Sequence, residues 1–104
     1  MNPLEMFKNA QKIQEQMVLL QEKLGEVIIT GCAGGGMVEV DMNGRMEPLA
    51  VRIAPEIVNK DEVLMLQELI ISAFSDAVEK AREFVAAEVG GNIPANLNIP
   101  GFPL

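Results

Sequence analysis

The sequence has no histidine, no tryptophan and no tyrosine, and it has a single cysteine. Without an imidazole, the chain cannot build a histidine general base or a histidine metal ligand, which excludes most serine–histidine, cysteine–histidine and zinc chemistries. Cys32 has no internal disulfide partner, and we expect it to be a small apolar side chain in a protein from a reducing compartment. The acidic residues are spread over positions expected to face solvent, so we predict no enzymatic activity, no metal and no cofactor.

Long apolar runs are also missing. The longest are far shorter than the roughly 20 residues that cross a bilayer, and the first residues, MNPLEMFK, lack the pattern of a signal peptide. We therefore expect a cytoplasmic protein without membrane contact or a small-molecule substrate. With 104 residues, 49% of them hydrophobic but only four of them Phe, the chain should form one domain with an aliphatic core.

The segment from Gly34 to Ile53 predicts two paired strands. In its first half, apolar side chains alternate with acidic ones, as expected for a strand with one buried face; the apolar ones are Val38, Val40 and Met42. Asn43-Gly44 follows and favours a two-residue type I′ turn. Such a turn would place Arg45, Glu47 and Leu49 on the buried face. Val51 and Ile53 would extend the same face.

Prolines and glycines set the limits of the strands. Pro48 lacks an N–H group, so the last strand should start late, lie at an edge or carry a bulge there, and Pro55 should end it. A further strand is predicted at Val27–Gly31. The triple glycine Gly34–Gly36 predicts a turn or bulge rather than a phosphate-binding loop, because no Gly-Lys-Ser/Thr follows it.

Two long helices should flank these strands. Asn2, Pro3 and Glu5 form a capping pattern, and the first helix should run through Leu24 and stop at Gly25. Its narrow apolar stripe consists of Met6, Ile13, Met17, Leu20 and Leu24. The second helix should run from about Lys60 to Val89, capped by Asn59 or Asp61, and its broad apolar face is suited to packing on a sheet and on a second chain. That face consists of Val63, Leu66, Leu69, Ile70, Ala73, Phe74, Ala77, Val78, Ala81, Phe84 and Val85.

The expected order is helix, three strands, helix and tail, an α+β fold. Residues 1–89 should form the domain. Residues 90–104 are rich in Pro and Asn and carry no charge, so they should form an extended or disordered tail. The alternative for the tail is docking on a partner chain through Ile93, Ile99 or Phe102.

Five segments, in order along the chain, resemble the YbaB/EbfC family of bacterial nucleoid-associated DNA-binding proteins. They are the Gln- and Met-rich first helix, Met37–Gly44, Val51–Pro55, Ala73–Ala77 and the ending Pro100-Gly101-Phe102. The resemblance implies an α-β-β-β-α protomer with a three-stranded antiparallel sheet and two long helices, and a tweezer-like homodimer. It also implies location in the cytoplasm and nucleoid, and binding of double-stranded DNA with bending or compaction and a role in gene expression. The chain departs from the family where Glu39 and Asp41 stand on the outer strand face.

The charge distribution selects the surface for DNA. The net charge is −7, but residues 1–24 carry three acidic and three basic residues and are neutral. Lys8 and Lys12, four residues apart, share one helix face. The predicted DNA-binding residues are Lys8, Asn9, Gln11, Lys12 and Gln16, with Lys23, Arg45 and Arg52 secondary. So few cations predict weak, salt-sensitive binding with low sequence specificity.

One further class of function stays open. The protein-interaction alternative uses the acidic surface and the apolar C-terminal tail to recruit other proteins without direct DNA binding, and it explains the negative charge more simply. Dimerisation is expected on physical grounds as well, because a three-stranded sheet has two free edges and a closed two-fold dimer buries exposed edges and apolar faces.

Overall fold

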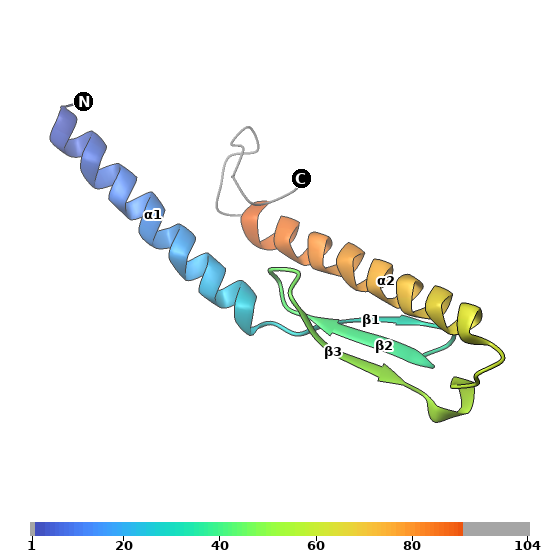
Figure 1. Ribbon diagram of the computed structural model, residues 1–104. Coiled ribbons are helices and arrows are strands. Elements are labelled where there is room, and N and C mark those ends of the chain that lie inside the picture. Colours follow the sequence, from blue (N-terminus) through green and yellow to red (C-terminus); the bar gives the residue numbers. More distant parts are fainter. Residues whose placement is uncertain (1, 91–104) are drawn as a thin grey trace.

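The computed structural model describes residues 2–90. Its elements, in chain order, are α1 (Pro3–Glu26), β1 (Ile29–Ala33), β2 (Val38–Met42), β3 (Pro48–Ile53), the short 3₁₀ helix η1 (Pro55–Ile57) and α2 (Val63–Gly90) (Figure 1). The three strands form one antiparallel sheet in the order β1-β2-β3. The predicted α-β-β-β-α protomer is therefore confirmed. The expectations for residues 91–104 lie outside the described residues.

Helix α1 begins as its sequence predicts. The Asn2 side chain accepts a hydrogen bond from the backbone N–H of Glu5 at 2.8 Å, and Pro3 is the first helical residue. The prediction that Gly25 stops the helix was wrong, because α1 continues to Glu26 and only Val27 turns to extended backbone. One glycine in the last turn weakens a helix by about 1 kcal/mol at most, which is too little to end it.

The first strand lies two residues later than predicted. Pairing with β2 begins at Ile29, opposite Met42, and ends at Ala33, opposite Val38. Val27 and Ile28 instead connect α1 to the sheet in extended backbone. The glycine turn is confirmed: the φ angles of Gly34, Gly35 and Gly36 are +62°, +68° and +91°, a region that side chains disfavour.

The predicted two-residue type I′ turn was wrong. Met42 pairs with Pro48 after a register shift, so a five-residue loop joins β2 to β3, and Gly44 does not have a positive φ. The buried side chain of Asn43 holds this loop by accepting hydrogen bonds from the backbone N–H groups of Arg45 at 2.9 Å and Glu47 at 3.1 Å. A proline cannot donate to the ladder, which explains why regular pairing fails at this point.

The longer loop also removes Arg45 and Glu47 from the strand face on which they were predicted. Of the three alternatives at Pro48, the late start is not observed, because β3 begins at Pro48 itself, whereas the edge position and the irregular pairing are both present. The prediction that β3 ends before Pro55 is confirmed. Val51 and Ile53 do share a face with Val40 and Val38, which they oppose directly.

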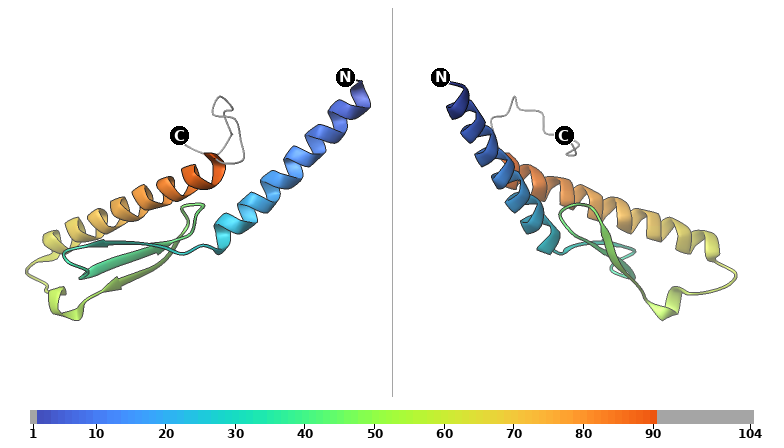
Figure 2. Two further views of the ribbon diagram at one scale, coloured as in Figure 1. Left: turned by 180° about the vertical axis from the view of Figure 1, so that it is seen from behind. Right: turned by 60° about the vertical axis from the view of Figure 1, so that its left-hand side comes forward.

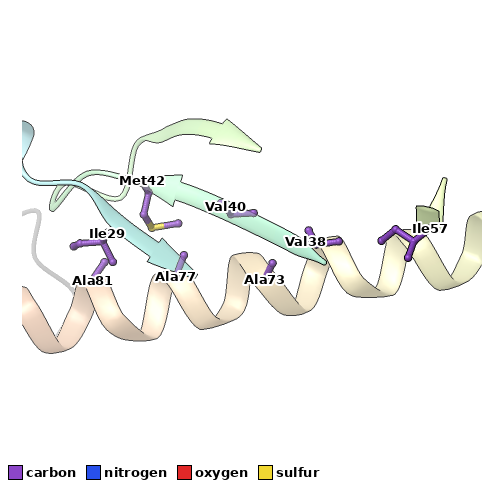
Figure 3. Close-up of a cluster of buried hydrophobic side chains, with 8 residues drawn as sticks. All are labelled: Ile29, Val38, Val40, Met42, Ile57, Ala73, Ala77 and Ala81. Atoms are coloured by element: carbon purple, nitrogen blue, oxygen red, sulfur yellow. The ribbon is translucent and has the colours of Figure 1, made fainter. Parts of the chain in front are cut away.

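The core lies between α2 and the first two strands (Figure 3). Val38, Val40 and Met42 are buried, as their alternation predicts. Ala73, Ala77 and Ala81 present the small side of α2 to the sheet and are fully buried. Their size lets the helix backbone approach β1 so closely that Gly31 has no room for a side chain. Helix α2 starts at Val63 rather than Lys60, because Asn59 first forms a turn by accepting a hydrogen bond from Asp61 N–H.

Helix α1 contacts the rest of the chain mainly through its C-terminal end. Leu24 packs with Val85 and Val89 near the end of α2, and Met17 and Leu20 border this cluster. The N-terminal half extends away from the sheet and α2 (Figure 2). We call this half, residues 3–14, the arm. Among residues 2–90, no helix combines the length and apolar character needed to cross a membrane.

Candidate nucleic-acid interface

Helix α1 has two faces with different chemistry. At 100° per residue, the Met6–Ile13–Met17–Leu24 stripe lies on one side, and Lys8 and Lys12 lie on the opposite side. All eight predicted DNA-binding residues are exposed. Six of them belong to α1, whereas Arg45 lies in the β2–β3 loop and Arg52 lies on β3. Lys8, Lys12 and Gln16 therefore lie in one row along α1, whereas Lys23 lies near the C-terminal end of the helix and Arg52 lies on the sheet.

The two arm lysines carry charges that no carboxylate in the described chain neutralises. Within residues 2–90, neither Lys8 nor Lys12 forms an ion pair or a hydrogen bond through its side chain. They lie one helical turn apart, and Gln16 follows one turn beyond Lys12. This row presents two ammonium groups and an amide within about two turns of helix, an arrangement that can follow a row of phosphates.

Two other predicted cations are held by carboxylates. The Nζ atom of Lys23 lies 2.7 Å from Oε2 of Glu88, which links the C-terminal ends of the two helices. Nε of Arg45 lies 3.1 Å from Oε1 of Glu47 in its own loop. Exposed pairs of this kind contribute only about 0–1 kcal/mol. A phosphate could therefore compete for either cation, but each is less available than the arm lysines.

Arg52 belongs to an ion-pair network on the face of the sheet that α2 does not cover. Its Nη1 and Nη2 atoms donate to the two carboxylate oxygens of Asp41 at 2.7 and 2.9 Å, and its Nε donates to Glu39 at 3.2 Å. Thr30 also donates to Asp41, at 2.8 Å. The hydrogen bonds from Arg52 and Thr30 lower the pKa of Asp41 to about 2, and those to Asp41 and Glu39 raise the pKa of Arg52. One guanidinium with two carboxylates leaves this face negative.

A second network covers the outer edge of β1. The carboxylate of Asp76 accepts a hydrogen bond from the backbone N–H of Cys32 at 2.9 Å, and Lys80 donates to the carbonyl of Thr30 at 3.3 Å. Asp76 and Lys80 also pair with each other at 2.9 Å. The Cys32 N–H and the Lys80 ammonium lower the pKa of Asp76, and the Asp76 carboxylate raises the pKa of Lys80. Two backbone groups on this strand edge, the Cys32 N–H and the Thr30 carbonyl, thus have side-chain partners.

Cys32 itself is exposed and is not packed as the small apolar filler that the sequence suggested. With pairing at Ile29–Met42, the even-numbered residues of the strand point away from α2, and Cys32 joins Thr30 on the open face. The sequence signal for both networks was present but needed the strand register: Asp76 and Lys80 have i,i+4 spacing, and Glu39 opposes Arg52.

Comparisons with known proteins show which proteins this chain and its fold resemble. Residues 1–95 match the profile of the YbaB/EbfC DNA-binding family. A protein named "Nucleoid-associated protein" from Dictyoglomus thermophilum is 43% identical over 99 residues, covering 95% of this chain and 94% of that one. A protein of the same name from Pelotomaculum thermopropionicum is 41% identical over 100 residues, covering 96% and 94%. The crystal structure of an uncharacterized protein from Helicobacter pylori has the same fold, with a TM-score of 0.76 at 24% identity over 88% of this chain and 96% of that one.

Proposed function

The chain belongs to the YbaB/EbfC DNA-binding family, and we propose that it binds double-stranded DNA as a homodimer through the lysine face of the α1 arm. It acts in the bacterial nucleoid, bends or compacts the duplex with low sequence specificity, and thereby influences gene expression. The observation that carries this proposal is the pair of exposed arm lysines, which form no ion pair with any residue among 2–90, in a chain with a net charge of −7.

The arm belongs to the part of the chain that repels a polyanion least. Residues 1–24 carry no net charge, whereas residues 25–59 carry five acidic and two basic residues and residues 60–104 carry seven and three. Lys8 and Lys12 lie near the tip of the arm, away from the acidic sheet face around Asp41 (Figure 1). Distance matters here, because charges separated by more than about 8–10 Å are largely screened at physiological salt.

The number of cations sets the strength and the specificity of binding. Two lysines per chain let a dimer neutralise about four phosphates, which predicts weak and strongly salt-dependent affinity. The lysine face of the arm carries no aromatic side chain for base stacking. Amide side chains such as Gln16 can contact phosphates or base edges. Phosphate contacts without a set of base contacts position a protein on DNA but do not specify a sequence.

Dimerisation is supported by the difference between the two sheet edges. The β1 edge is covered by Asp76 and Lys80. Next to β3, the N–H of Ala54 donates to the carbonyl of Met37. Because hydrogen-bonded pairs alternate along an antiparallel ladder, the backbone N–H and C=O groups of Leu49, Val51 and Ile53 then point away from β2, toward the outer edge of the sheet. Leu49 and Val51 are also 53% and 46% exposed in the single chain. Pairing of two β3 edges around a two-fold axis would satisfy these groups and bury the apolar side chains.

Such a dimer explains how a small acidic protein could bend DNA. Helix α1 is about 36 Å long, and a two-fold axis at β3 would carry two arms that project from a shared centre (Figure 2). One duplex that contacts both arms would have to bend to reach both. If each arm bound a separate duplex, the dimer would bridge the two duplexes. Either outcome compacts DNA without base-specific contacts.

The experiment compares two charge-matched double variants by fluorescence anisotropy on a labelled duplex. Lys8→Glu/Lys12→Glu reverses the arm lysines, and Lys60→Glu/Arg82→Glu applies the same charge change at exposed positions outside α1. We expect the arm variant to lose binding and the control to bind more weakly than the native protein but measurably. Equal losses in the two variants would show that net charge, and not the arm, governs binding. Sedimentation equilibrium on each variant checks that dimerisation is intact.

A protein-interaction function is the second candidate, and the acidic sheet face favours it. Glu39 and Asp41 leave a negative surface around Arg52 that fits a basic protein partner rather than nucleic acid. The uncharged tail, residues 90–104, would supply apolar contacts. A pull-down compares the full chain with a chain truncated after Val89. If the truncated chain retains every partner, the tail has no part in such binding.

A further inference from the structure

The apolar stripe of α1 continues beyond the part that α2 covers. Met17, Leu20 and Leu24 pack near Val85 and Val89 in the last turns of α2. The next members of the same stripe toward the N-terminus are Ile13 and Met6, which are 57% and 59% exposed. Helix α2 ends at Gly90, so nothing in residues 2–90 covers the stripe along the arm.

The borders of this exposed stripe are polar but uncharged. Gln16 lies along one side, and Gln14 and Gln21 lie along the other, while the lysines and glutamates of α1 lie on the opposite half of the helix. Amide side chains can both donate to and accept from a peptide backbone. The stripe with these borders is therefore suited to an extended, uncharged, apolar segment whose backbone groups need hydrogen-bond partners.

One segment of this chain has that chemistry and starts in the right place. Residues 91–104, GNIPANLNIPGFPL, contain no charged residue and carry apolar side chains separated by Asn, Gly and Pro. The three prolines in this segment disfavour a helix. The segment follows directly on the end of α2, and Val89 already belongs to the cluster that includes Leu24 and borders Met17.

The length of the segment matches the length of the stripe. From Met17 to Met6, helix α1 rises about 16 Å. Fourteen residues in extended or polyproline II conformation span about 43 Å, so the segment can reach the tip of the arm even with several residues used to leave α2. Because both surfaces belong to one chain, their effective concentration is of the order of millimolar, which favours contact within the chain over contact with a separate molecule.

We propose that residues 91–104 lie along the apolar stripe of α1 in the same chain and cover Met6 and Ile13. The tail then completes the stripe that α2 begins, and it holds the arm in a fixed direction while the opposite face, with Lys8 and Lys12, stays open. This proposal does not depend on DNA binding, because the tail would cover the apolar stripe and leave the side chains of Lys8 and Lys12 exposed.

The test measures proximity between the tail and the methionine methyl groups of the arm. A nitroxide is attached to the full-length protein in the variant Cys32→Ser/Asn98→Cys, and ¹³C-methyl methionine spectra are recorded with the nitroxide oxidised and reduced. We expect the signals of Met6 and Met17 to lose most of their intensity in the oxidised state. Met37 immediately precedes β2 and Met65 lies in the first turn of α2. That end of the sheet and of α2 is far from α1 (Figure 1), so both signals should keep their intensity.

A mixed sample separates contact within one chain from contact between chains. Nitroxide-bearing chains without ¹³C are mixed in excess with ¹³C-labelled chains that lack a nitroxide. The proposal predicts no loss of signal at Met6 or Met17 in this mixture. It is overturned if these signals keep their intensity in the first sample, or if the mixture attenuates them as strongly, which would place the tail on the partner chain.

Two matched variants show whether the contact is apolar. Ile99→Asp/Phe102→Asp should restore the Met6 signal in the nitroxide-bearing chain, because it places charges against the stripe. Asn92→Asp/Asn96→Asp adds the same charge at polar positions and should leave the attenuation in place. If the apolar variant attenuates Met6 as strongly as its control, the proposed packing is wrong.

Discussion

Replacing Gly31 with alanine should destabilise the fold far more than an ordinary glycine substitution. Gly31 lies on β1 beneath α2, and a Cβ atom there would overlap the backbone nitrogen of Ala77 and the carbonyl oxygen of Ala73 and lie 2.6 Å from the Cα of Ala77. These are backbone atoms of a packed helix, so relief requires α2 to move away from the sheet as a unit. Such movement would also open the contacts of Val38 and Val40.

The expected loss can be estimated. Overpacking in a core costs about 1–3 kcal/mol, and a clash with two helical residues belongs at the upper end, about 3 kcal/mol. A small domain has roughly 5–15 kcal/mol of stability, and each 1 kcal/mol lowers the midpoint of thermal unfolding by about 4–8 °C. We therefore expect a fall of about 12–24 °C, measured by circular dichroism at fixed protein concentration because a dimer's stability depends on it.

Gly25→Ala is the matched control, with the opposite expected sign. Gly25 lies in the last turn of α1, and its added Cβ would meet only the guanidinium end of Arg45, which can rotate away. Alanine is preferred over glycine in a helix by up to about 1 kcal/mol, so this variant should be as stable as the native protein or more so. A Gly31→Ala protein that unfolds within a few degrees of the Gly25→Ala protein would refute the close approach of β1 and α2.

Two further predictions concern the sheet face and the base of the arm. The folded-state pKa of Asp41, about 2, lies below the unfolded value near 3.8, so its contribution to stability is complete above about pH 4 and is lost as the pH falls toward 2. Asp41→Asn should therefore flatten the acid limb of a plot of unfolding free energy against pH, and an unchanged slope between pH 4 and 2 would contradict the Arg52 network. Leu24→Ala should cost about 2–5 kcal/mol at the junction of the helices, because Leu24 is fully buried there. Hydrogen exchange should then show faster opening of α1 while β2 keeps its protection, and equal changes in both would mean that the arm is not a separate unit.

The elements that follow from local chemistry were predictable from the sequence. The Asn2 cap, the glycine turn at Gly34–Gly36 and the buried alternation of β2 depend on neighbours in the chain, and all three are present. The apolar face predicted for α2 includes Ala73, Ala77 and Ala81, which pack on the sheet. The cap and the turn depend on residues a few positions apart, and the buried faces of β2 and α2 repeat with the period of their element, so no knowledge of the tertiary arrangement was needed.

The features that failed depend on distant parts of the chain. Asn43-Gly44 did not form a type I′ turn, because Asn43 uses its side chain within the loop and Gly44 N–H donates to the carbonyl of Leu24 at 2.8 Å. No local sequence pattern predicts this hydrogen bond between Gly44 and the end of α1. The pairing of Arg52 with Asp41 required the register of β2 against β3, because the two residues lie diagonally across the strands.

The candidate site shows the same division. The shared face of Lys8 and Lys12 followed from helix periodicity, and the structure adds that no carboxylate among residues 2–90 pairs with either lysine. That Lys23, Arg45 and Arg52 are held by Glu88, Glu47 and Asp41 could not be read from the sequence, because two of the three pairs join separate elements.

The salt dependence of DNA binding tests the role of the arm most directly. The association constant of the native protein for a duplex is measured over a series of salt concentrations and compared with that of Lys8→Gln/Lys12→Gln, which removes both charges and adds none. Four phosphate contacts in a dimer predict a slope of log K against log salt concentration of about −3.6, and the variant should have a slope near zero. A variant with the native slope would contradict the assignment of DNA binding to the arm.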